Sequence, residues 1–316
     1  MNSKLLIRTA GILIILIIPT VVCSNELDEA ITRLKNKDQR RIAAQEIERI
    51  GEPALKRLTK EALNKENHDD ERVSALILMG KIRSKSKQMH SRNVLQVRGA
   101  STARTPVQDD TEYVLSDIVR KDSNSRIREA AAIGLGHIGA LSTKQKLKEA
   151  MDDRSVNVRM RAVWALGKMG DSSGKDLALK TIKEKDVTGK LLAMEALESI
   201  GDSSVIPELE KNLTSEDVWT RIYSKLTIKK VQLSGLEGQG KLTYLKEALS
   251  DKQFEVNEWS AQELGKEILN KTAEKAGALE ILKEAAKNKK TAGSYAADKI
   301  LTKLTNSGEI PSERTE

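Results

Sequence analysis

Few side chains in this sequence have the types and spacing that catalysis or metal binding requires. There are three histidines, His68, His90 and His137, and none lies at metal-ligand spacing from another. The polar run 68–71 could hold a metal ion, but a solvated helix start is the simpler interpretation. The sequence contains no glycine-rich phosphate loop and no Ser-His-Asp arrangement. We therefore expect no catalytic residue, no metal ligand and no cofactor, and hence a protein that is not an enzyme.

Acids and bases recur in pairs six residues apart. The pairs are Glu66 and Arg72, Asp122 and Arg128, Asp153 and Arg159, and Glu184 and Lys190. One interpretation makes the bases a row that binds a ligand. The other, which we favour, is a structural ladder of charge-assisted hydrogen bonds between a turn and the helix after it, fixing each hairpin and its neighbour. Because the pairs repeat along the chain, we assign the ladder to Asp122, Arg128, Asp153 and Arg159.

The elements that would position these pairs come from a repeat. Three similar segments, 127–139, 158–170 and 189–201, follow one another at a step of 31 residues. In each, apolar or small residues at offsets 0, 4, 7, 8 and 11 fall on one face of an α-helix, and a closing glycine stands where the helix should end. A fixed period of this size predicts an α-solenoid, in which each unit buries its apolar face against its neighbours.

The same frame extends in both directions with weaker copies. They lie at 41–51, 71–83, 218–230, 256–268 and 293–304, with Arg83 in the position of the closing glycine. A shorter helical pattern follows each closing glycine, so the unit is a helical hairpin, and the chain should hold about eight of them. In the copy at 218–230 the frame places Val218, Ile222 and Leu226 on the buried face.

The bulky aromatic residues are few. The chain of 316 residues is 39% hydrophobic but only 3% aromatic, so the core must consist of Ala, Leu and Ile between closely spaced helices. Trp164, Trp219 and Trp259 fall in the longer helices of their hairpins. We expect them to pack between repeats rather than to act as binding hot spots.

The central copies resemble the HEAT repeat family, most closely the short HEAT-like repeats of the phycobilisome-lyase type. The residues that carry the resemblance are Val158, Arg159, Ala162, Ala165, Leu166, Gly167, Gly170 and Asp171, followed by Ile206, Pro207 and Leu209. The resemblance implies an all-α fold, a right-handed superhelix of the HEAT or armadillo type whose longer helices line a concave surface for a peptide or protein partner. It also leaves open a lyase-type enzyme or an accessory factor.

The first residues have the pattern of an export signal. Lys4 and Arg8 precede a mostly apolar run at 10–22, which is too short to span a bilayer but fits the core of a signal peptide cleaved before Asn25. We therefore expect a protein exported to the periplasm, the cell surface or the medium. In the alternative, the lone Cys23 lies in a loose lipobox and anchors a lipoprotein. The expected domains are a signal peptide at 1–24, a repeat solenoid at 25–305 and a disordered tail at 306–316.

One stretch interrupts the repeat. Between the second and third copies the step exceeds the period by about 25 residues, and we assign the surplus to a loop at 84–108. This loop supplies most of the net charge of +8, and the rest of the solenoid is nearly neutral. The candidate binding residues are Lys85, Lys87, Arg92, Arg98 and Arg104.

The basic loop has two interpretations. It could bind an anionic polymer, a lipid or an acidic partner, as a surface adhesin would, or it could be a solvated insertion with no partner. Nucleic acid is disfavoured as a ligand, because no aromatic residue is interleaved for base stacking. The sequence as a whole predicts an exported, non-enzymatic scaffold for protein–protein interaction and does not name the partner.

Overall fold

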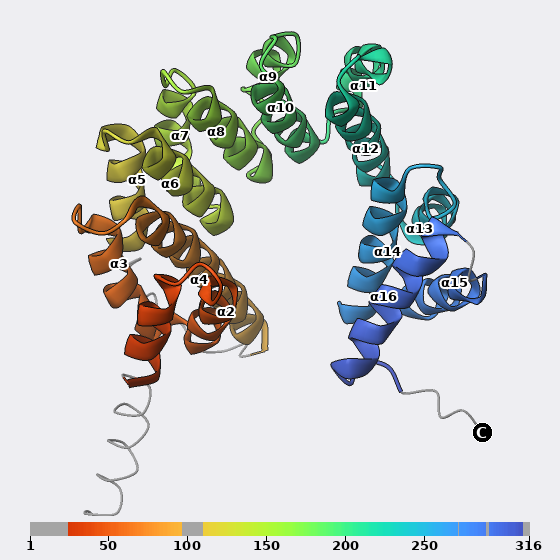
Figure 1. Ribbon diagram of the computed structural model, residues 1–316, viewed down its shortest axis with the longest axis horizontal. Helices are drawn as coiled ribbons and strands as arrows, with labels where there is room; N and C mark the ends of the chain where they lie inside the picture. The colour runs from red at the N-terminus through yellow and green to blue at the C-terminus, as the bar shows by residue number, and fades with distance from the viewer. Residues whose placement is uncertain (1–24, 97–109, 271, 289–290, 312–316) are drawn as a thin grey trace, which may run out of the picture. The chain divides into compact units, whose positions relative to one another are not determined.

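The computed structural model describes residues 25–96, 110–270, 272–288 and 291–311, and every regular element within these ranges is helical (Figure 1). The chain divides into two units, residues 1–175 and 176–316. Each unit is a stack of helical hairpins, and the described ranges hold eight hairpins in all. The prediction of an all-α solenoid is confirmed. We call the first helix of each hairpin its A helix and the second its B helix.

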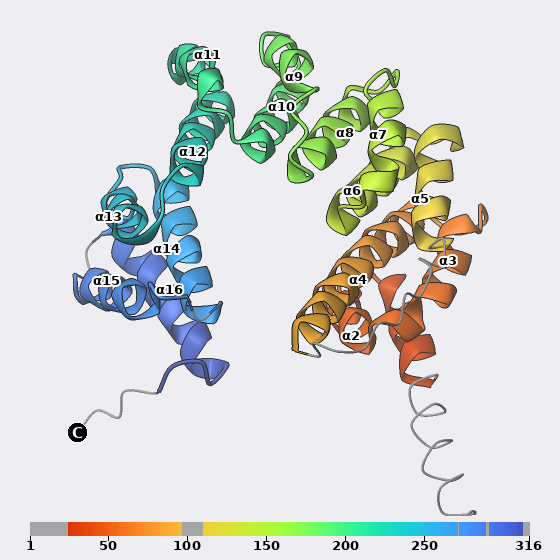
Figure 2. The same ribbon diagram turned by 180° about the vertical axis from the view of Figure 1, so that it is seen from behind.

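The first unit contains four hairpins. Its helices are a helix at 25–34, α2 (Arg40–Ile50), α3 (Leu55–Leu63), α4 (Asp69–Gln96), α5 (Asp110–Lys121), α6 (Ser125–Ile138), α7 (Lys144–Ala150) and α8 (Val156–Lys168). Short 3-10 turns, Glu52–Ala54 and Leu141–Thr143, precede α3 and α7. The B helices α4, α6 and α8 pack side by side, and the A helices α3, α5 and α7 form a second layer against them (Figure 2).

The second unit also contains four hairpins. Its helices are α9 (Lys175–Thr181), α10 (Val187–Ile200), α11 (Ile206–Glu210), α12 (Val218–Ser234), α13 (Gly238–Ala248), α14 (Phe254–Leu269), α15 (Lys275–Lys287) and α16 (Ala292–Asn306). The 3-10 helices Ser203–Val205 and Lys211–Thr214 flank α11. The B helices α10, α12, α14 and α16 pack in chain order. In the described part of the chain, no helix has both the length and the apolar character needed to cross a membrane.

The closing glycines set where the B helices end. Gly139, Gly170 and Gly201 have φ angles of 62°, 70° and 69°, in the left-handed region that a side chain disfavours. The N–H of Gly139 returns to the carbonyl of Leu135, which satisfies a helix-end acceptor. The predicted helix ends are confirmed at these three positions.

Small residues let the B helices of the first unit approach each other closely. A Cβ added to Gly80 of α4 would lie only 2.4 Å from the carbonyl oxygen of Gly134 in α6. Leu76, Leu115 and Leu135 are fully buried around this crossing. The Ala and Gly stripe of the sequence is therefore a contact between backbones rather than between large side chains.

The predicted loop at 84–108 is wrong for its first half. α4 continues through Gln96, so residues 84–96 are helical, while 97–108 lie outside the described residues. Arg83 stands where the other repeats have a glycine, so nothing at that point favours a left-handed helix end. The Ser, Lys and Gln residues that follow are compatible with a helix, and it runs on.

The predicted tail at 306–316 is also partly wrong. α16 includes Asn306, and a turn with Gly308 at a φ angle of 74° precedes Ile310, which is only 7% exposed. Ile310 belongs to the same buried cluster as Leu304. Residues 312–316 lie outside the described part of the chain.

The predicted buried face of α12 is out of register by two residues. Val218 is 51% exposed, and Ile222 and Leu226 are only partly buried. The buried stripe of α12 consists instead of Thr220, Ser224, Thr227, Ile228 and Val231. Small polar residues take the buried positions in the first half of α12, where a hydrophobic pattern does not register them, and Ile228 and Val231 follow in the second half.

The three tryptophans differ in their burial, and the register of α12 determines the exposure of Trp219. Trp259 of α14 packs in the core of the second unit, as predicted. Trp219 of α12 is 54% exposed, so its predicted packing between repeats is wrong. Trp164 of α8 is half-buried and lies against α6.

Candidate functional site

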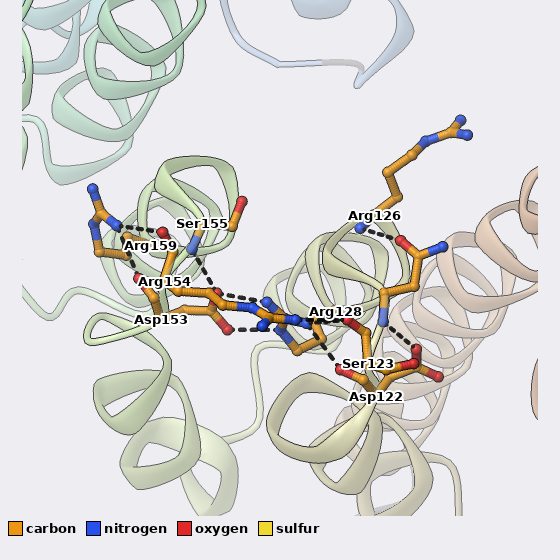
Figure 3. A network of polar contacts seen from close by, with 9 residues as sticks. Asp122, Ser123, Arg126, Arg128, Asp153, Arg154, Ser155 and Arg159 are labelled. Carbon is orange, nitrogen blue, oxygen red and sulfur yellow. Dashed lines mark hydrogen bonds and ion pairs between the residues drawn. The ribbon is translucent and has the colours of Figure 1, made fainter.

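Arg128, at the start of α6, joins two hairpins. Its Nη1 donates to the carbonyl oxygens of Asp122 and Ser123 in its own turn, at 2.9 and 3.0 Å (Figure 3). Its Nε and Nη2 donate to the carboxylate of Asp153 in the following hairpin, at 2.7 and 2.8 Å. One guanidinium therefore fixes the turn before α6 and the turn before α8.

The same pattern occurs one hairpin earlier. Nη2 of Arg72 in α4 donates to the carboxylate of Asp122 at 2.6 Å, and its Nε donates to the carbonyl of Ala62 at 2.9 Å. Arg159, one hairpin later, donates from Nη1 to the carbonyl of Asp153 at 2.9 Å. The structure thus brings all four ladder residues into one network, with an altered pairing. The backbone carbonyl of each Asp accepts a hydrogen bond from the Arg six residues later. The carboxylate of each Asp accepts instead from the Arg of the preceding hairpin.

The ladder carboxylates also shape their own turns. Oδ1 of Asp153 accepts the N–H of Ser155 at 2.8 Å, and Oδ1 of Asp122 accepts the N–H of Asn124 at 2.9 Å. Burial alone would raise the pKa of Asp153, but the hydrogen bonds from Arg128 and from the Ser155 N–H outweigh it and lower that pKa. The Arg128 pKa is raised, chiefly by its hydrogen bonds to Asp153. These charged groups therefore bind one another and the backbone, which holds the hairpins together.

Three further residues occupy the Arg128 position, and the sequence pattern missed them. Arg40, Arg221 and Asn257 each donate to the backbone carbonyl six residues upstream, at 3.0, 2.6 and 2.9 Å. The shared partner is a carbonyl, which every residue has, so an acid six residues before a base is not the general signal. The predicted pair Glu184 and Lys190 shares no bond among the described residues.

Carboxylates of the polar run 68–71 form hydrogen bonds with residues of neighbouring hairpins. The carboxylate of Asp70 accepts from Arg40 at 3.2 Å and from Arg126 at 2.8 Å, and Asp69 accepts from Asn124 at 2.6 Å. Across the ranges that the structure describes, no cluster of His, Cys, Asp and Glu is arranged to hold a metal ion.

The candidate residues of the basic segment fall into two groups. Lys85 and Lys87 lie on α4 and form ion pairs with Glu48 of α2 and Glu112 of α5, at 2.7 and 2.5 Å. The side chains of Arg92, Arg98 and Arg104 lie outside the described residues. The described part of this segment therefore ties α4 to its neighbours.

A second set of bases lies on the B helices of the first unit. Lys81, His137 and Lys168 occupy one repeat position, ten residues after the first residue of each buried stripe, on α4, α6 and α8. Trp164 lies beside them, with its ring centre 5.6 Å from that of His137 and 5.9 Å from Nζ of Lys168. We call Lys81, His137, Trp164 and Lys168 the basic–aromatic row.

Glycine makes room for the aromatic member of this row. A Cβ on Gly136 would meet Cζ3 of Trp164 at 2.5 Å, so the indole lies in the space that Gly136 leaves. The ring is held in an edge-to-face arrangement with the imidazole of His137. Its position is fixed by packing rather than left to solvent.

Burial and like charge act together on His137. Partial burial is the largest cause that lowers its pKa, and the positive charges of Lys81 and Lys168 lower it further. The negative charge of Glu48 opposes these effects without reversing them. The imidazole is therefore neutral near pH 7 and becomes charged only at a more acidic pH than usual.

Comparison with known proteins identifies the repeats. The family model of HEAT repeats matches residues 111–189 and, in a second overlapping match, residues 145–225. The sequence matches none of the curated proteins.

Several solved structures are similar to this chain at low sequence identity. The complex of CpcE and CpcF of phycocyanin lyase from Nostoc sp. PCC7120 is 15% identical, with a TM-score of 0.46, over 79% of this chain and 94% of that chain. YibA of E. coli is 15% identical, with a TM-score of 0.45, over 90% and 96%. Human deoxyhypusine hydroxylase in complex with glycerol is 14% identical, with a TM-score of 0.37, over 91% and 99%.

Proposed function

HEAT repeats make up residues 111–225 of this chain, and from that premise we propose an exported, non-enzymatic scaffold that holds a protein partner against the B helices of its first unit. The observation that carries the proposal is the basic–aromatic row on α4, α6 and α8. It supplies a tryptophan and three basic side chains on adjacent helices of one layer. Tryptophan is among the residues that most often dominate binding energy at protein interfaces, and complementary charge beside it gives specificity and faster association.

The contrast between the two sets of charges supports this assignment. Arg72 and Arg128, with Asp122 and Asp153, spend their hydrogen bonds on holding hairpins together. Lys168 is exposed and has no ion pair among the described residues, and its Nζ lies 5.9 Å from the centre of the Trp164 ring. A surface charge that the fold does not use is available to a partner.

Affinity capture tests the proposal. The purified protein is used as bait against the envelope and culture medium of its own host, in parallel with the variants Trp164→Ala and Lys168→Glu. The matched control is Tyr113→Ala, which removes an aromatic side chain that is 62% exposed on the A helix α5 of the same unit. A partner retained by the wild type and the control, but lost by both row variants, is the expected result. Retention by every variant contradicts the proposed site.

Export is supported by the composition of the first residues and is tested separately. Lys4, Arg8 and the apolar run at 10–22 fit a cleaved signal. Cell fractionation followed by N-terminal sequencing should find the mature chain outside the cytoplasm and starting at Asn25. A Cys23→Ala variant decides between soluble export and a lipid anchor, because only the anchored form would lose membrane association.

A further inference from the structure

We infer that the segment of the partner that docks on the basic–aromatic row is an extended acidic peptide, with one carboxylate bound at Lys168 and the next at His137, beside the Trp164 indole. The inference rests on the proposed function and adds the chemistry of the partner. Its basis is a charge pattern in the B helices that depends on one repeat position.

That repeat position is the residue that directly precedes, in the sequence, the position of the row's bases. In α2 and α10 it holds an acid, Glu48 and Glu198, and these carboxylates bind Lys81 and Lys230 of the next B helix at 3.2 and 2.9 Å. In α4 and α6 it holds glycine, Gly80 and Gly136. The bases of the next helices, His137 and Lys168, thus lose the acid that pairs their counterparts, and neither has an ion pair among the described residues.

The remaining acid near the row is already shared. Glu48 accepts from Lys81 at 3.2 Å and from Lys85 at 2.7 Å, so two positive charges face one negative charge. Arg161 of α8 pairs with Glu129 of α6 at 3.4 Å, which neutralises the charges next to the row. A carboxylate from outside is the group that would complete the pairing at His137 and Lys168.

The spacing of the helices sets the spacing of the acids. Packed helices lie about 8–10 Å apart, and an extended chain in the polyproline II conformation has three residues per turn and advances about 3.1 Å per residue. Carboxylates at every third residue of such a peptide lie on one face about 9 Å apart, so they would meet the bases of successive B helices. The indole of Trp164, between Lys168 and His137, offers an apolar face to the residues in between.

Binding should also respond to pH. The groups facing His137 are Lys81 of α4, Lys168 and Trp164 of α8, and Glu48 of α2, and the two lysines disfavour its protonated form. A bound carboxylate would favour that form, so the peptide and a proton bind together. Affinity should therefore rise as the pH falls from about 7.5 to about 5.5, a range in which glutamate stays ionised.

The test uses synthetic peptides and the full protein. One fluorescein-labelled peptide carries glutamate at every third position among small uncharged residues, and the second has glutamine in place of each glutamate. Fluorescence anisotropy should show binding of the glutamate peptide only. Lys168→Glu should weaken this binding at least about tenfold, and His137→Gln should abolish its pH dependence.

The matched control is Lys303→Glu. Lys303 is an exposed base at the same repeat position, on α16 in the second unit. Its reversal should leave peptide binding unchanged, and thermal unfolding shows whether each variant is folded. Equal binding of the glutamine peptide, or equal loss with Lys168→Glu and Lys303→Glu, would overturn the inference.

Two other ligands are arms of the same experiment. Heparin and vesicles with anionic lipid carry negative charge without the spacing of a peptide. We expect that His137→Gln and Lys168→Glu do not change the binding of either ligand. If the captured partner is lost with Trp164→Ala but retained with Lys168→Glu and His137→Gln, the proposed function stands and the acidic chemistry is wrong. If no partner depends on the row at all, the proposed function itself fails.

Discussion

Arg128 and Asp153 belong to different hairpins and are joined by two hydrogen bonds, of 2.7 Å from Nε and 2.8 Å from Nη2. Arg128 is only 4% exposed, and its remaining nitrogen is taken by carbonyls of its own turn. The pair is thus a buried joint between repeats. Such a joint matters most when one partner is removed, because the other charge is then buried without compensation.

Loss of Arg128 should therefore be costly. We expect Arg128→Met to lower the free energy of unfolding by about 3 kcal/mol, since Asp153 keeps its place but loses its cation. Urea unfolding followed by circular dichroism measures the change. The control is Arg120→Met, which removes an exposed arginine paired with Asp117 at 3.7 Å and should cost at most about 0.5 kcal/mol. Equal costs for the two variants would contradict the buried joint.

Stability at acidic pH should depend on Asp171. Its carboxylate accepts hydrogen bonds from Ser173 and pairs with Lys148, which lowers its pKa to about 2. The folded state therefore favours the charged form, and this contribution is present above the unfolded pKa of about 4 and is lost as the pH falls toward 2. We expect Asp171→Asn to show a shallower loss of stability than the wild type between these values. If the free energy of unfolding falls equally steeply with pH in the wild type and in Asp171→Asn across that range, the expectation is wrong.

The role of the closing glycines in ending helices can be tested at a position where an added side chain meets no other atom. No atom lies within 4 Å of a Cβ added to Gly139, so its φ angle of 62° alone opposes a side chain. We expect Gly139→Ala to destabilise the protein by about 1 kcal/mol. Gly240 in α13 is equally open but has no left-handed φ, so Gly240→Ala should instead stabilise by up to about 1 kcal/mol. Thermal melts that rank the two variants in the opposite order would be decisive against this account.

The register of α12 makes a prediction about two tryptophans. Trp259 is buried, and Trp259→Ala should cost about 3–5 kcal/mol of unfolding free energy. Trp219 is largely exposed and contacts Tyr223 at a ring-centre distance of 6.4 Å, so Trp219→Ala should cost at most about 1 kcal/mol. A large loss from Trp219→Ala would restore the register that the sequence first predicted.

The sequence predicted the hairpins well where the repeat stripe and its glycine occur together. At Gly139, Gly170 and Gly201 the glycine ends the helix as expected. At Arg83 and in α12 the signal failed for physical reasons. A helix without a stop signal continues, and in α12 the buried positions are held by small polar residues such as Thr220 and Ser224, which a search for apolar residues passes over.

The candidate site was harder to predict than the fold. The acid partner of Arg72 is Asp122, 50 residues away, so no local spacing could identify it. The basic–aromatic row was equally hidden, because His137 and Trp164 gain their relation only from the packing of α6 against α8. Comparing the residue at the position before each base across the repeats would have been an available signal, since it is a glutamate in α2 and α10 but a glycine in α4 and α6.

The bond between Arg72 and Asp122 has a consequence for how the molecule tolerates change. It fastens the second hairpin to the third directly, across a sequence separation of 50 residues. The entropy of closing a loop grows only slowly with its length, by about 0.6 kcal/mol for each doubling. The chain between α4 and α5 should therefore accept a spliced guest sequence, such as a tag or a reporter domain, while both hairpins keep their stacking.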